Sequence, residues 1–125
     1  MLRTTFQDIV IKTIQSLPEE FKDQLSNIDI VIEDWPKRSQ LRDMGLSNKY
    51  ELLGLYEGIP ITGRNQGYNL VLPDKITIFQ KPIESQCSTI KEIKDEIVNV
   101  VKHEIAHHFG INDETLDEIE NKNRH

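Results

Sequence analysis

Apolar residues recur every three or four positions at both ends of the chain, which is the spacing of amphipathic helices. Near the N-terminus this pattern predicts a helix over residues 4–17 and a short second helix over 19–25. A longer helix is predicted over 89–109, with Ser88 as its N-cap. The acidic segment 113–122 predicts a last helix, because carboxylates favour a helix N-terminus.

Between these helices, apolar and polar residues alternate as they do in strands. Strands are predicted within three segments, 28–34, 50–62 and 75–80. The polar segments 37–49 and 63–69 are predicted to be connections. The order of helices, strands and helices predicts an α+β fold, in which a small mixed or antiparallel sheet packs against a long helix.

The bulk composition favours one folded domain over residues 1–125. Hydrophobic residues make up 37% and charged residues 29%, which is typical of globular rather than disordered chains. No apolar run approaches the roughly 20 residues of a membrane helix, and Asp8 and Lys12 interrupt any signal-peptide pattern. Cys87 is the single cysteine, which predicts a reducing compartment such as the cytoplasm and a residue of no special reactivity rather than a thiol catalyst.

The formal net charge of −6 argues against nucleic acid as a partner, since nucleic-acid binding needs an excess of lysine and arginine on one face. The basic residues are spread along the chain, and their longest local cluster, residues 37–42, is short.

The stretch "HEIAHHFGIND", residues 103–113, carries the candidate chemistry. His103 and His107 are four residues apart on the long predicted helix, so they stack on one face and can hold one ion between them. Glu104 points to the same side, and in H-E-x-x-H sites this carboxylate polarises a water rather than binding the metal. Gly110 permits the helix to end, and Asp113 then lies within about 10 Å of extended reach. Two imidazoles and a carboxylate leave a fourth position open, as in a catalytic zinc site with one Zn²⁺ per chain.

His108 is expected to be a hydrogen-bonded core histidine rather than a ligand, because it falls in the middle of the apolar arc of the helix. That arc comprises Ile90, Ile93, Ile97, Val98, Val100, Val101, Ile105 and Phe109. A helix whose histidines are merely surface residues is the alternative for the motif. The long amphipathic helix, the helix-ending glycine and the nearby third ligand type disfavour that alternative.

The stretch 103–113 has the H-E-x-x-H-x-x-G-x-x-D form of certain zincins. Together with "LLGLYEGIPIT" and "LPDKITIFQKPI", it resembles the minimal zincin-like metallopeptidase family of small bacterial proteins, over most of the chain. The resemblance implies a minimal zincin-like fold, zinc held by His103, His107 and Asp113, and Glu104 as general base. No methionine follows the motif, so the methionine turn of larger zincins is absent.

The resulting hypothesis is zinc-dependent hydrolysis of a peptide or protein substrate, with neither nucleic acid nor a membrane as partner. Zincins hold peptides on an edge strand beside the active-site helix. The candidate is the segment that precedes the helix, Lys75, Ile76, Thr77 and Ile78, although these residues also suit an ordinary strand. Tyr56 and Tyr68 are weak candidates for stabilising the oxyanion. Two alternatives remain: a metal-dependent RNA hydrolase, and a non-catalytic interaction module that keeps its metal for stability.

Overall fold

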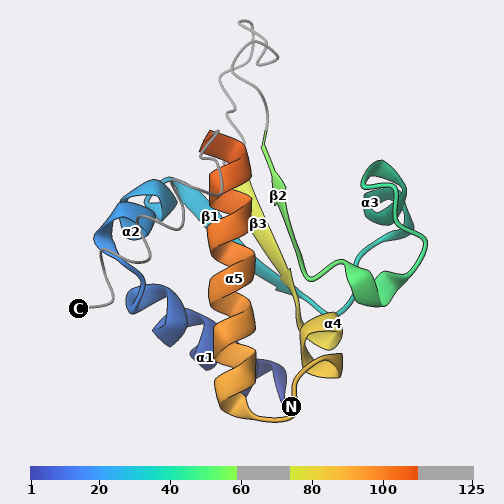
Figure 1. Ribbon diagram of the computed structural model, residues 1–125, viewed down its shortest axis with the longest axis horizontal. Helices are drawn as coiled ribbons and strands as arrows, with labels where there is room; N and C mark the ends of the chain where they lie inside the picture. The colour runs from blue at the N-terminus through green and yellow to red at the C-terminus, as the bar shows by residue number, and fades with distance from the viewer. Residues whose placement is uncertain (59–73, 110–125) are drawn as a thin grey trace, which may run out of the picture.

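The computed structural model describes residues 1–58 and 74–109, with only the backbone of residues 107–109. Its elements follow the chain in this order (Figure 1): α1 (Arg3–Gln15), α2 (Glu19–Leu25), β1 (Ile28–Glu33), α3 (Arg38–Asp43), the 3₁₀ turn η1 (Lys49–Glu51), β2 (Gly54–Glu57), β3 (Asp74–Phe79), α4 (Gln80–Ser85) and α5 (Ile90–Phe109). The predicted loop 63–69 and the predicted last helix lie outside the described residues.

The described strands form one mixed sheet in the order β1–β3–β2. β1 pairs parallel to β3, with Ile28 opposite Asp74, and β2 pairs antiparallel to β3, with Gly54 opposite Ile78. α5 runs across this sheet (Figure 1). The α+β class and the small mixed sheet against a long helix are therefore confirmed.

The two faces of β3 belong to different apolar clusters. Ile76 and Ile78 are fully buried in the main core with residues of α1, α2 and α5. Phe79 is buried on the other side, beside Leu52 and Leu55, in a smaller cluster that includes Leu41 of α3. Because both of its faces are covered, β3 is buried almost throughout its length, as expected of a central strand.

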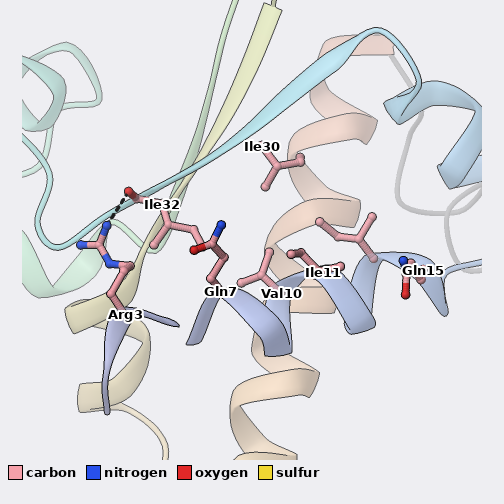
Figure 2. Close-up of a pocket in the computed structure, with 8 residues that line it drawn as sticks. Arg3, Gln7, Val10, Ile11, Gln15, Ile30 and Ile32 are labelled. Carbon is pink, nitrogen blue, oxygen red and sulfur yellow. Dashed lines mark hydrogen bonds between the residues drawn. The ribbon is translucent and has the colours of Figure 1, made fainter. Parts of the chain in front are cut away.

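Arg3 links the first turn of α1 to the C-terminal end of β1 and to the start of α4. Its guanidinium donates to the Ile32 carbonyl oxygen at 2.9 Å (Figure 2). It also donates to Asp34 Oδ1 at 2.6 Å. Its Nε donates to Gln80 Oε1 at 2.9 Å, and Gln80 is only 1% exposed. This network satisfies a buried amide that would otherwise cost free energy.

Two short helices, α3 and α4, form where the pattern predicted only a polar connection and the end of a strand. α3 ends in a Schellman turn: the N–H of Leu46 donates to the Leu41 carbonyl, and the N–H of Gly45 donates to the Arg42 carbonyl. Gly45 has a φ of +70°, which glycine adopts without strain. α4 accommodates a proline because its first-turn N–H groups have no partner inside the helix.

α5 begins one residue later than predicted, because Thr89 rather than Ser88 caps it. Thr89 Oγ1 accepts from the N–H of Glu92 at 3.1 Å, and Glu92 Oε2 accepts from the N–H of Ser88 at 3.2 Å. The predicted apolar arc is buried along most of α5, but Ile90 is 53% exposed. Among the described helices, none combines the length and apolar character required to cross a membrane.

Candidate active site

A cleft of about 570 Å³ lies where α5, the start of β2 and the turn after α3 meet. His103 and Glu104 both line it, as their neighbouring positions on one helix predict. Its other described lining residues are Met44, Leu46, Glu51, Leu52, Leu53, Gly54, Glu96, Asn99 and Val100. The cleft therefore brings the candidate ligand and base of α5 next to the strand β2.

The imidazole of His103 is oriented by its own helix. Its Nδ1 lies 2.8 Å from the carbonyl oxygen of Asn99, one turn earlier in α5. A carbonyl can only accept, so Nδ1 carries the hydrogen and the lone pair of the neutral ring lies on Nε2. Side-chain patterns in the sequence could not identify this acceptor, because it is a main-chain oxygen.

The carboxylate of Glu104 meets the outer edge of β2. Its Oε2 accepts from the N–H of Tyr56 at 3.2 Å. The N–H of Phe79 donates to the Leu53 carbonyl, so Leu53 and Phe79 form a hydrogen-bonded pair. In an antiparallel ladder every second residue turns its N–H outward, which directs the N–H of Tyr56 away from β3. Glu104 is thereby held at the hydrogen-bonding edge of β2 that faces away from β3.

Gly54 allows α5 to approach β2 this closely. A Cβ atom at Gly54 would overlap Cγ1 of Val100, and it would lie 3.3 Å from the Thr77 carbonyl oxygen. Val100 precedes Glu104 by one turn, so the contact sets the height of the helix over the strand. Glycine inside a strand often marks such a close approach.

A second hollow, of about 470 Å³, lies between α1 and β1 and lacks comparable chemistry. It is lined by apolar side chains such as Ile11, Ile30 and Ile32, together with Arg3 and two glutamines (Figure 2). None of its described lining residues is a histidine, aspartate or glutamate. It provides neither a general base nor a metal ligand of the predicted kind.

The other two predicted metal ligands are His107 and Asp113. The backbone of α5 carries His103 and His107 one turn apart, but the side chains of His107 and His108 lie outside the described residues. Gly110, Asp113 and Tyr68 also lie outside them. Within residues 1–58 and 74–106, no three histidine, cysteine or acidic side chains come together in a way that could hold a metal ion.

The prediction that Lys75, Ile76, Thr77 and Ile78 form an edge strand is wrong. They lie in β3, whose main chain pairs with β1 on one side and with β2 on the other. Proximity to α5 in the sequence did not place this strand at the edge, because β1 adds to its other side by a parallel pairing that the pattern does not reveal. β2 is the edge strand that lies against α5 among the described strands.

Cys87 lies partly buried just before α5 and outside the cleft. Burial raises the pKa of its thiol, and the carboxylates of Glu96, Glu92 and Asp95 raise this pKa further. A raised pKa lowers the thiolate fraction at neutral pH, which agrees with a residue of no special reactivity.

Comparison with known proteins gives the same class as the fold and the motif. The chain matches the zincin-like metallopeptidase family over residues 25–123, and it belongs to that family. No curated protein matches it. Among solved structures, it is similar to a conserved hypothetical protein from Thermus thermophilus, at 18% identity and a TM-score of 0.58. That match covers 87% of this chain and 94% of the other, and it supports the fold alone.

Proposed function

We propose that this chain is a zinc-dependent peptidase, in which His103, His107 and Asp113 bind the metal and Glu104 is the general base. The observation that carries the proposal is the cleft in which His103 and Glu104 lie together at the outer edge of β2. Membership of the zincin-like metallopeptidase family supports it.

His103 fits the role of a zinc ligand. Its Nδ1–H is bound to the Asn99 carbonyl, so Nε2 is the nitrogen with a lone pair for a metal. A set of two histidines and one aspartate suits Zn²⁺ with one position open. When bound, zinc supplies a lowered water pKa and Lewis acidity toward a carbonyl.

Glu104 then moves the protons of hydrolysis. Its carboxylate takes a proton from water as the water oxygen bonds to the peptide carbonyl carbon. Glu104 passes that proton to the departing amine nitrogen as the C–N bond breaks. The N–H of Tyr56 holds Oε2 of this carboxylate in the cleft, so this residue contributes its main chain to the site.

β2 replaces β3 as the strand that we propose holds the substrate. Outward-facing main-chain groups of an edge strand can pair with an extended peptide. Gly54 alternates with the residues that pair with β3, so its polar main-chain groups face outward, beside the Tyr56 N–H that holds Glu104. An extended segment beside them would lie across the cleft, close to Glu104.

The charge of the cleft disfavours the RNA hydrolase alternative. Three glutamates, Glu51, Glu96 and Glu104, line the cleft, and none of its described lining residues is lysine or arginine. A phosphate backbone would meet like charge there. The peptide bond is uncharged and carries no such penalty.

Two measurements test the proposal. Elemental analysis of purified protein should find one zinc per chain in the wild type and a large loss in His107→Ala. Wild-type protein should also hydrolyse an unfolded protein substrate, stop when a chelator is added, and leave RNA intact.

An equal zinc content in the wild type and in His107→Ala would refute His107 as a metal ligand. Cleavage of RNA alone would favour the nuclease. A metal-dependent melting temperature without turnover of any peptide would favour the interaction module.

A further inference from the structure

The cleft beside α5 has two walls of different character. The α5 wall carries Glu96, His103 and Glu104, whereas the turn after α3 contributes Met44 and Leu46. Met44 is 49% exposed, although methionine is an apolar side chain that folding tends to bury. The Schellman turn at Gly45 holds these two side chains on the wall that faces the cleft.

The carboxylates of Glu51 and Glu96 differ from those acids of the described surface that have a basic partner. Asp34 is paired with Arg3, Glu84 with Lys81, and Glu19 with Lys22. Glu51 and Glu96 form no ion pair and accept no side-chain hydrogen bond within residues 1–58 and 74–106. Both line the cleft, so its negative charge is available to a ligand.

The distance between Glu96 and the proposed base sets a position along a substrate. Glu96 and Glu104 are eight residues apart in α5, which corresponds to about 12 Å along the helix axis. An extended peptide advances about 3.3 Å per residue. A substrate side chain that reaches Glu96 therefore belongs to a residue roughly three or four positions from the scissile peptide bond beside Glu104.

We infer that the cleft selects extended peptide segments with a lysine or arginine roughly three or four residues from the scissile bond and an apolar residue between them. The basic side chain pairs with Glu96, supported by Glu51 at the cleft margin, and the apolar side chain packs against Met44 and Leu46. This inference rests on the proposed function for the position of the bond, but the selective binding itself does not require turnover.

Binding of short labelled peptides to the full-length Glu104→Gln protein, in the presence of zinc, tests the inference by fluorescence anisotropy. The parent peptide contains one lysine and one leucine in an alanine background. Its first variant replaces lysine with glutamate, and its second replaces leucine with serine. At low ionic strength we expect the lysine peptide to bind about tenfold more tightly than the glutamate peptide, and this ratio to fall at high salt. The serine peptide should bind more weakly than the parent at any salt concentration.

Matched second substitutions identify the residue responsible. Adding Glu96→Gln should lower the lysine-to-glutamate ratio to about threefold or less. Glu20→Gln removes the same charge from the exposed surface of α2, away from the cleft, and should leave the ratio unchanged. Equal binding of the two peptides, or a ratio that Glu96→Gln does not alter, would overturn the inference.

Hydrolysis of the same peptides by the wild type separates this inference from the proposed function. Selective binding without cleavage would keep the inference and refute the peptidase. Cleavage with no preference for lysine would refute the inference alone. If no peptide binds and none is cleaved, both are refuted.

Discussion

The hollow between α1 and β1 and the cleft beside α5 enclose similar volumes, about 470 and 570 Å³, yet they differ in the ionisable groups that line them. In the hollow, the guanidinium of Arg3 is bound to Gln80, Asp34 and the Ile32 carbonyl. In the cleft, His103 Nδ1 bonds the Asn99 carbonyl, Glu104 Oε2 accepts from the N–H of Tyr56, and both residues line the cavity. The size of a hollow therefore does not distinguish the two, whereas the arrangement of its ionisable groups does.

The strongest test of this comparison is the removal of the proposed base. Glu104→Gln should retain bound metal and lower the rate of peptide hydrolysis by about a hundredfold or more, because the amide cannot accept the proton. The rate is measured with a chromogenic peptide and the metal by elemental analysis. Glu20→Gln is the control for loss of one charge. Retained turnover in Glu104→Gln would remove the assigned base.

A methyl group at Gly54 should disturb the cleft by moving α5 away from β2. Gly54→Ala is expected to destabilise the protein by about 1–3 kcal/mol, since the new Cβ would overlap Val100. Urea unfolding measures the change. Adding Val100→Ala makes room, so the double variant should be less destabilised than the two single effects added together.

Gly45→Ala is the companion variant, because a Cβ atom there has no other atom within 4 Å. Its cost, on the order of 1 kcal/mol, should come from the positive φ alone. Additive behaviour of Gly54→Ala and Val100→Ala would contradict the proposed steric contact.

Arg3 lines the hollow between α1 and β1, so its substitution should change the stability of the fold without changing the rate of peptide hydrolysis. Arg3→Ala leaves the buried Oε1 of Gln80 without its donor, which we expect to cost about 1–2 kcal/mol of unfolding free energy. The same variant should cleave peptides at the wild-type rate at a temperature where it is folded. A loss of peptide hydrolysis in folded Arg3→Ala would show that the hollow between α1 and β1 takes part in function.

The smallest effect concerns Cys87. Because the pKa of its thiol is raised in the folded chain, a thiol reagent should react more slowly with native protein than with protein unfolded in urea near pH 8. The neutral thiol is favoured in the fold. Its contribution to stability is therefore present below the ordinary cysteine pKa and is lost as the pH rises through the raised value. A native rate equal to the unfolded rate would contradict the raised pKa.

The periodic pattern predicted the long elements well. α1, α2, β1, β3 and α5 lie within a residue or two of their predicted bounds, because each presents a regular apolar face to the core. The short helices α3 and α4 escaped prediction, since their local capping and turn bonds leave little periodicity to read. The strand order was not predicted either, because the alternation of apolar and polar residues along a strand does not identify which strands pair with it.

The candidate site was predictable where it depends on side-chain spacing, and not where it depends on the main chain. The neighbouring positions of His103 and Glu104 in one cleft followed from helix geometry. The hydrogen bonds of His103 to the Asn99 carbonyl and of Glu104 to the Tyr56 N–H could not be predicted, because almost every residue carries a main-chain carbonyl and N–H. Gly54 offered one usable signal: a glycine within a strand pattern suggests close approach by another element.

The pairing of β1 with β3 has a consequence for the order in which this molecule assembles. Ile28 is joined to Asp74, so a long intervening stretch must be closed before the two strands meet. β2 relies on the same central strand for its own pairing. Since Gly54 of β2 lines the cleft, the proposed activity should be recovered during refolding together with the completed sheet, rather than with the early formation of α5.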